Sequence, residues 1–167
     1  MKHVWTGKYL AVVVDGDWEY VKRTRDISAA VILATTDEGE VVLIEQFRVP
    51  LGRACIELPA GLVGDDVPGE HPATSAAREL NEETGFSADH WAELGEFASS
   101  PGMVGESFRL FRATGLRKTG SGGGVAGEAI VTHVVKLADV PTFIAAKRAE
   151  GCGIDVKLLA VLPYATG

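Results

Sequence analysis

The chain has 167 residues, 46% of them hydrophobic, and a formal net charge of −7 at pH 7. Its length fits a single domain with a sizeable core. The acidic balance argues against a nucleic-acid partner, which would need a basic stripe. No apolar run approaches the length of a membrane span and no signal-peptide pattern opens the chain, so we expect a cytoplasmic protein. Cys55 and Cys152 are expected to be free thiols.

Five β-prone runs precede residue 59 of the chain. They are Tyr9–Val14, Trp18–Arg23, Ser28–Ala34, Val41–Phe47 and Cys55–Leu58. The first two flank Asp15-Gly16-Asp17, which is typical of a hairpin turn. The third and fourth are expected to pair with each other across residues 35–40. We therefore expect a hairpin over residues 1–26 and a main domain over 27–167.

A helix is predicted from Pro72 to Thr84, because proline is accepted in the first turn and Gly85 stands where a left-handed residue ends a helix. At about 100° per residue, one face of this helix carries small and apolar side chains suited to packing on a sheet. These are Ala73, Ala76, Ala77, Leu80 and Thr84.

Three acidic residues, Glu79, Glu82 and Glu83, share an arc beside the packing face of this helix. Carboxylates so close repel one another, and hard divalent cations relieve the repulsion because they bind oxygen ligands. Arg78 lies one turn before Glu82 and can orient it by a charge-assisted hydrogen bond. The alternative interpretation is a solvated acidic helix face.

The second half of the chain predicts further strands and two helices. Strands are expected near Leu94–Ala98, Ser107–Thr114 and Ile130–Leu137, with a glycine-rich loop at 119–127. Asp139 is expected to cap a helix from Pro141 to about Glu150, and Asp155 to cap another over Val156–Leu162. The simplest packing of these elements is an α/β fold, a mixed sheet with helices on its faces.

The spacing between Gly64 and Phe86 resembles the Nudix box. The matching positions are Gly64, Glu70, Arg78, Glu79, Leu80, Glu82, Glu83, Gly85 and Phe86. Further segments are similar to the ADP-ribose pyrophosphatase group, namely Gln46–Arg48, Glu57–Gly61, Ser100–Gly102 with Glu106, and Gly153–Ala160. Members of that group hydrolyse ADP-ribose and related nucleoside diphosphate sugars. The resemblance implies a Nudix α/β/α sandwich with a central mixed β-sheet, and an extra N-terminal antiparallel hairpin through which a homodimer forms.

One position departs from the pattern of that group. In these pyrophosphatases the glycine of the Pro-Ala-Gly turn is usually also the first glycine of the box. Here Gly61 stands three residues too early and Gly64 satisfies the count. We interpret this as a three-residue insertion within Leu62–Gly69, whose composition suits an exposed turn.

The resemblance also implies a metal site and a catalytic base. The implied ligands of Mg²⁺, with Mn²⁺ as an alternative, are Glu79, Glu82, Glu83 and the backbone carbonyl of Ala60. Glu70 and Gly64 would support this site. Glu128, at the end of the glycine-rich loop, occupies the place of the base, with the glycines giving the loop hinge freedom. The alternative is that Glu128 only makes a flexible loop more soluble.

The substrate contacts are less specific. Arg48 is a candidate for gripping the diphosphate or the terminal ribose, or it is an ordinary surface arginine. Glu106 is a candidate for ribose hydroxyls or metal-bound waters, and otherwise caps a strand. Arg53 could pair with a box glutamate or reach the substrate. Four aromatic residues are available to stack on adenine, and the sequence does not choose among them: Trp5, Trp18, Tyr20 and Phe47.

The sequence alone leaves three possible functions. The first is Mg²⁺-dependent hydrolysis of ADP-ribose, or a related nucleoside diphosphate sugar, to a nucleoside monophosphate and a sugar phosphate. The second keeps this chemistry with another substrate, such as GDP-mannose or a dinucleotide. The third is a non-catalytic module that binds a nucleotide metabolite and regulates a partner. The clustered glutamates argue against the third function.

Overall fold

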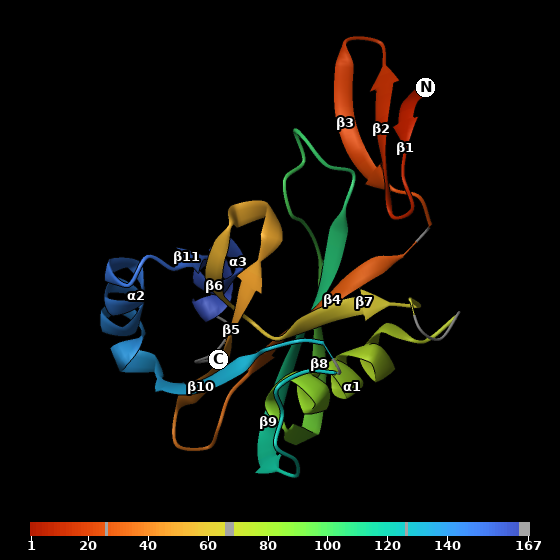
Figure 1. Cartoon of the computed structure of the whole chain (residues 1–167). Helices are drawn as coiled ribbons and strands as arrows, with labels where there is room; N and C mark the ends of the chain where they lie inside the picture. Colours follow the sequence, from red (N-terminus) through yellow and green to blue (C-terminus); the bar gives the residue numbers. More distant parts are fainter. Residues whose placement is uncertain (26, 66–68, 126, 164–167) are drawn as a thin grey trace.

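The computed structural model describes residues 1–25, 27–65, 69–125 and 127–163 (Figure 1). The chain begins with an antiparallel sheet of three strands, β1 (Lys2–Thr6), β2 (Leu10–Asp15) and β3 (Trp18–Arg23). The predicted hairpin is present as β2 and β3, and Gly16 in its turn has a φ of +60°. The sequence analysis missed β1. In Figure 1 this N-terminal sheet extends away from the rest of the molecule.

Two mixed sheets of four strands form the centre of the main domain. One has the order β7-β4-β9-β8 and the other β10-β5-β6-β11. Their strands are β4 (Ser28–Ala34), β5 (Glu40–Arg48), β6 (Arg53–Glu57), β7 (Ala60–Val63), β8 (Phe86–Ala98), β9 (Ser107–Lys118), β10 (Val131–Lys136) and β11 (Gly153–Ile154). Each sheet holds one parallel pair, β4 with β9 and β6 with β11. The mixed character predicted from the sequence is therefore present, divided between two sheets.

The expected pairing of Ser28–Ala34 with Val41–Phe47 is wrong. These segments are β4 and β5, which belong to different sheets, although an isolated bridge joins Thr35, just after β4, to Val41. Both strands carry runs of buried residues without alternation. A strand covered on both faces gives such a run, so the hydrophobic pattern does not specify which neighbour it pairs with.

Helices cover the outer faces of the two sheets. Helix α1 (Pro72–Thr84) packs against β7, β4 and β8, whereas α2 (Val140–Ala149) packs against β10 and β11 on the opposite side (Figure 1). A third helix, α3 (Val156–Val161), follows β11, and two short 3₁₀ helices lie at Val49–Leu51 and Leu137–Asp139. This layering confirms the α/β/α fold class, with an additional N-terminal antiparallel sheet. The domain limits of 1–26 and 27–167 stay a prediction.

The limits of α1 agree with the sequence prediction. His71 precedes the helix and its ring nitrogen accepts a hydrogen bond from the N–H of Ala73, while Gly85 ends it with a φ of +71°. The packing face differs from the expected one, because Ala77 is exposed and Ser75 is buried. The Ser75 hydroxyl donates to the carbonyl of Leu62 in β7. This contact shows that the face turned toward the sheet includes the Ser75 side of the helix.

The two hydrophobic clusters follow the layers. One lies between α1 and the sheet that contains β4, and includes Ile32, Leu80 and Phe111. The other includes Leu43 of β5 and Leu110 of β9 and extends to residues of α2 and α3. Burial of this kind stabilises by about 25 cal/mol per Å² of apolar surface. The first cluster fixes α1, and with it the acidic arc of that helix.

Cap predictions for the last two helices had different outcomes. Asp155 caps α3, because its carboxylate accepts from the N–H of Lys157 at 2.8 Å. Asp139 precedes α2 without a capping hydrogen bond from its side chain, since its backbone is already helical and ends the preceding 3₁₀ turn. Among the described residues, no helix is long and apolar enough to span a membrane.

The N-terminal sheet contacts the main domain through its last strand. The Val21 N–H donates to the carbonyl of Met103 at 2.9 Å, and the Gly105 N–H donates to the carbonyl of Val21 at 2.8 Å. These bonds join β3 to the loop between β8 and β9. They also place Arg23, at the end of β3, beside Glu106 in that loop.

Candidate active site

A cavity of about 300 Å³ opens beside α1, and we call it the carboxylate cavity. It is lined by Gln46, Arg48, Ala60, Gly61, Leu62, Asp65, Arg78, Glu79, Glu82, Glu83, Val125 and Glu128. The fold thus brings the three helix glutamates, Ala60 and the expected base into one cavity. These residues come from α1, from the start of β7 and from the connection between β9 and β10.

Arg78 is the centre of an ion-pair network in this cavity. Its guanidinium lies 2.9 Å from Glu82, 3.0 Å from Glu79 and 3.3 Å from Glu70. Hydrogen bonding to Glu70 and the nearby carboxylates raise the pKa of Arg78 above its ordinary value. The predicted contact between Arg78 and Glu82 is therefore present. Glu70, whose side chain is only 6% exposed, holds the arginine from the other side.

Glu83 is the most buried carboxylate of the cavity, with 5% of its surface exposed. Its pKa is raised to about 8, mainly by burial and in part by the carboxylates of Glu79 and Glu128, whereas the hydrogen bond from the Ala60 N–H opposes the rise. Burial also raises the pKa of Glu79, against the opposing effect of Arg78. Burial disfavours the charged forms of both groups, and neighbouring carboxylates add to this effect.

This charge distribution fits a divalent cation. The carboxylates share a cavity in which they repel one another, and a hard cation with oxygen ligands would relieve that repulsion. Within the described part of the chain, no three His, Cys, Asp or Glu side chains are already grouped closely enough to bind a metal. Glu79 and Glu82 contact Arg78, and Glu83 accepts from Ala60 at 3.0 Å. The fit of a divalent cation to this cavity therefore rests on the negative charge of the carboxylates and on their shared cavity.

The two candidate box glycines lie in different surroundings. A Cβ added to Gly61 would lie 1.9 Å from the Cδ of Glu79, so the close approach of this glutamate requires glycine there. Gly64 follows β7 with a φ of +81°, a conformation that suits a turn. Residues 66–68 of the expected insertion lie outside the described part of the chain. Gly61, which was not among the predicted site residues, makes the contact with the helix.

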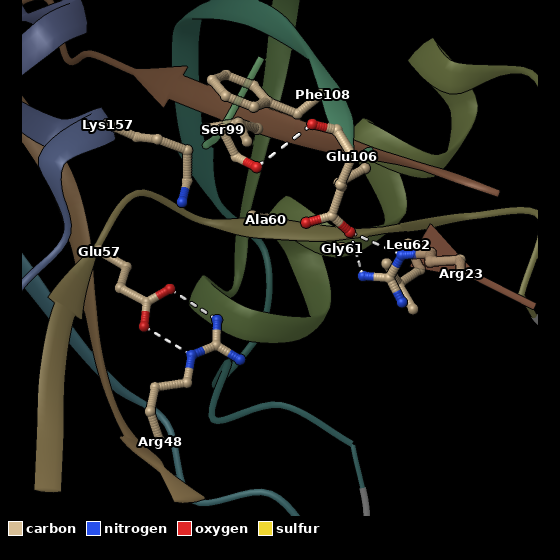
Figure 2. A pocket seen from close by; sticks show the side chains of 12 residues that line it. Arg23, Arg48, Glu57, Ala60, Gly61, Leu62, Ser99, Glu106, Phe108 and Lys157 are labelled. Atoms are coloured by element: carbon tan, nitrogen blue, oxygen red, sulfur yellow. Dashed lines mark hydrogen bonds and ion pairs between the residues drawn. The ribbon is translucent and has the colours of Figure 1, made fainter. Parts of the chain in front are cut away.

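A second cavity, of about 350 Å³, adjoins the first, and we call it the ion-pair cavity (Figure 2). Both cavities are lined by Arg48, Ala60, Gly61 and Leu62. The ion-pair cavity also contains charged residues from β3, β6, α3 and the loop after β8. These are Arg23, Glu57, Lys157 and Glu106.

Arg48 forms a two-pronged ion pair with Glu57. Its Nε and Nη2 lie 2.7 and 2.6 Å from the two carboxylate oxygens, as the paired dashed lines in Figure 2 show. Glu57 is buried, and its carboxylate fixes the plane of the guanidinium. Glu106 likewise pairs with Arg23, whose Nε lies 2.7 Å away. Two of the three predicted substrate residues, Arg48 and Glu106, therefore line this cavity, each held by a partner of opposite charge.

Sequence reasoning missed Arg23, Glu57 and Lys157 as site residues. Lys157 follows the cap of α3 and forms an ion pair with Asp155, and Figure 2 shows its amino group directed toward the cavity. Nothing local marks Arg23, which reaches the cavity from the N-terminal sheet, whereas Lys157 lies in the Gly153–Ala160 segment that carried part of the family resemblance. Glu57 had a signal, since it lies in the Glu-Leu-Pro-Ala-Gly segment that carried the family resemblance.

The remaining candidates lie outside these two cavities. Arg53 is exposed at the start of β6 and lines neither cavity. Trp18 and Tyr20 line a separate cavity with the loop at 101–104. Trp5 and Phe47 are exposed, at 58% and 63%. The structure brings none of these aromatic residues to the ion-pair cavity, which contains Phe108 instead.

Comparison with known proteins agrees with this geometry. A model of the NUDIX domain matches residues 24–150. An ADP-ribose pyrophosphatase of Mycobacterium tuberculosis is 46% identical over 92 residues, which are 55% of this chain and 44% of that protein. The match thus spans under half of that relative's length. A GDP-mannose pyrophosphatase of Yersinia enterocolitica is 31% identical over 172 residues, covering 95% of this chain and 85% of the relative.

A solved structure described as an ADP compounds hydrolase shares the fold. Its TM-score is 0.67 at 20% sequence identity, over 84% of this chain and 80% of the other. The similarity to the mycobacterial enzyme confirms the resemblance to ADP-ribose pyrophosphatases that the sequence segments indicated. The family match extends over most of the chain and includes the whole box from Gly64 to Phe86. The chain therefore belongs to the Nudix domain family.

Proposed function

We propose that the protein hydrolyses the diphosphate of ADP-ribose, or of a related nucleoside diphosphate sugar, to a nucleoside monophosphate and a sugar phosphate. One observation carries this proposal: a cavity rich in carboxylates shares a wall, which includes Arg48, with a cavity lined by ion pairs and by Lys157. A diphosphate at the shared wall would reach both. The similarity to an ADP-ribose pyrophosphatase supports the same substrate class.

Arg48 would hold the diphosphate, because it lines both cavities and presents a planar guanidinium. Glu57 orients that guanidinium through its two-pronged pair. Glu106 would accept hydrogen bonds from sugar hydroxyls, with Arg23 fixing its carboxylate. The ion-pair cavity would then receive one of the two sugars flanking the diphosphate.

Glu79, Glu82, Glu83 and the carbonyl of Ala60 would hold Mg²⁺ in the carboxylate cavity, with Mn²⁺ as a substitute. The cation would supply neutralising charge and polarise a phosphoryl oxygen. Arg78 keeps Glu82 in place at 2.9 Å. The attacking water needs a group that takes its proton, and we assign this role to Glu128, which lines the same cavity.

A second candidate function is hydrolysis of GDP-mannose. It is favoured by the Yersinia relative, whose similarity extends over 95% of this chain and 85% of its own length. The chemistry at the diphosphate would be the same. The two functions differ in the base and the sugar that the flanking cavities accept.

The direct test is a product assay with purified protein. ADP-ribose, GDP-mannose and a dinucleotide such as diadenosine tetraphosphate would be incubated with Mg²⁺, and products separated by ion-exchange chromatography. We expect AMP and ribose 5-phosphate from ADP-ribose, and no reaction after chelation of the metal. GMP and mannose 1-phosphate as the faster products would favour the second candidate. Binding without hydrolysis of any substrate would refute the enzymatic proposal and favour a regulatory module.

We also propose that the protein forms a homodimer through its N-terminal sheet. Large apolar side chains are exposed on its strands and turns, including Trp5, Tyr9 and Trp18 at 58%, 54% and 63%. Their burial against a second copy would contribute the usual hydrophobic stabilisation. Light scattering should give twice the mass of the chain, and Trp18→Glu should shift it toward the monomer. A monomeric wild-type protein would refute this proposal.

A further inference from the structure

The carboxyl end of α1 is held by backbone bonds from the glycine-rich segment 119–125. The last four carbonyls of an α-helix lack intrahelical partners. Here the carbonyls of Glu82 and Glu83 accept from the N–H groups of Gly124 and Gly123, each at 2.9 Å. The carbonyl of Gly85 accepts two more bonds from the start of the segment. The segment is therefore docked on the helix, and its glycines do more than provide the expected hinge freedom.

Glycine is required for this docking because the two backbones approach closely. A Cβ on Gly122 would lie 2.5 Å from the carbonyl carbon of Thr84 and 2.8 Å from the nitrogen of Gly85. Gly122 also has a φ of +67°, which side chains rarely adopt. By contrast, a Cβ on Gly120 would lie 3.7 Å from its nearest neighbour, in ordinary contact and without a positive φ.

The docked segment leads directly to Glu128. The Val125 N–H donates to a carboxylate oxygen of Glu128, and the Glu128 N–H donates to the carbonyl of Val125, both at 3.0 Å. A Cβ on Gly124 would lie 2.5 Å from the same carboxylate oxygen. The position of the Glu128 side chain thus depends on where the glycine backbone rests.

We infer that Gly122 and Gly124 are positioning residues, which set Glu128 against the glutamates of α1 by docking the segment on the end of that helix. The carbonyls that hold the segment belong to Glu82 and Glu83, whose side chains line the carboxylate cavity. One helical turn therefore places both the glutamates and the loop that carries Glu128. This inference rests on the proposed function, in which Glu128 takes the proton of the attacking water.

The test compares steady-state hydrolysis by Gly122→Ala and Gly124→Ala with the control Gly120→Ala. Misplacing a catalytic group by about 1 Å can cost roughly 100-fold in rate, so we expect kcat of the two test variants to fall about that far while KM changes by less than about threefold. Gly120→Ala should keep the wild-type kcat. Gly122 and Gly124 both have a positive φ, so circular dichroism should confirm that each variant is folded; in the Gly124 variant the new Cβ would meet only side chains.

A double-mutant cycle separates positioning from general damage. If Gly122 acts through Glu128, Gly122→Ala should lower kcat by less than about threefold in a Glu128→Gln background, because effects of groups that act as one unit do not add. If the double variant instead loses kcat by the product of the two single losses, the inference is overturned. A wild-type kcat in both glycine variants would overturn it as well.

Hydrogen exchange of segment 119–125 gives a readout that is independent of activity. We expect protection of this segment in the wild type and in Gly120→Ala, and its loss in Gly122→Ala. Rapid exchange in the wild type would overturn the docking itself. A wild type with protected amides and no hydrolysis of any substrate would refute the proposed function, and with it the catalytic purpose of the docking.

Discussion

Arg78→Ala should destabilise the fold measurably, because this cation is shared by three carboxylates. The guanidinium lies within 3.3 Å of Glu70, Glu79 and Glu82, and is 25% exposed, whereas Glu70 is 6% exposed. Breaking a buried pair costs about 3–5 kcal/mol, and an exposed pair contributes roughly 0–1 kcal/mol. The partial exposure places this loss near the lower buried value, at about 3 kcal/mol. For a chain of this size, about 2–4 °C per kcal/mol gives a fall of roughly 6–12 °C in Tm.

Thermal unfolding followed by circular dichroism, without divalent cations, measures this loss. Arg117→Ala is the matched control, because Arg117 pairs with Asp89 on the surface, where the two side chains are 66% and 43% exposed. It should cost less than about 1 kcal/mol. Arg78→Lys should fall between the two variants, since lysine keeps the charge but lacks the planar fork. A Tm for Arg78→Ala no lower than that of the control would refute the network as a source of stability.

Three further predictions concern the site and the thiols. Glu83→Gln should lower kcat by about 100-fold or more without lowering Tm, because a metal ligand contributes several kcal/mol to transition-state stabilisation. Normal turnover in this variant would contradict the assignment of Glu83 as a ligand. Gly61→Ala should raise the Mg²⁺ concentration needed for half-maximal activity, since its Cβ would displace Glu79; an unchanged Mg²⁺ titration would show that this glutamate is not needed. Burial raises the pKa of Cys55 to about 11 and also raises that of Cys152. Both thiols should therefore react slowly with a thiol reagent at pH 7.5, faster as the pH rises, and quickly in denaturant. Rapid labelling of the native protein at pH 7.5 would contradict the burial of these thiols.

Local signals were sufficient to predict α1 and several strands. Pro72, with its fixed φ, and Gly85, which accepts a left-handed conformation, define the two ends of the helix, and the observed limits are Pro72–Thr84. The Asp15-Gly16-Asp17 turn likewise predicted the pairing of β2 with β3. The box glutamates share a cavity because helical periodicity alone places them on one arc. These features depend on neighbours within about one helical turn.

Features set by distant contacts were not accessible from the pattern. The division of β4 and β5 between two sheets depends on what covers each face, and both strands read as buried runs. Arg23 reaches the ion-pair cavity because Val21 bridges to the loop after β8, a contact between residues more than 80 positions apart. Arg48 was expected either to grip the diphosphate or ribose or to be an ordinary surface arginine. Its ion pair with Glu57 was not predicted, and the register of β5 against β6 places Arg48 opposite Arg53 instead.

Gly61 and Gly64 both qualify as the first glycine of the box, depending on the criterion. Spacing along the chain and contact in the structure select different residues. Counting selects Gly64, because the spacing to Glu70 is then correct. Contact selects Gly61, because only a residue without a Cβ allows Glu79 to lie against the start of β7. The extra residues expected within Leu62–Gly69 can change the count without moving the start of β7, since β7 is fixed by its pairing with β4 from Val31 to Ser28. The start of β7 therefore keeps its geometric role next to α1, whichever glycine satisfies the motif.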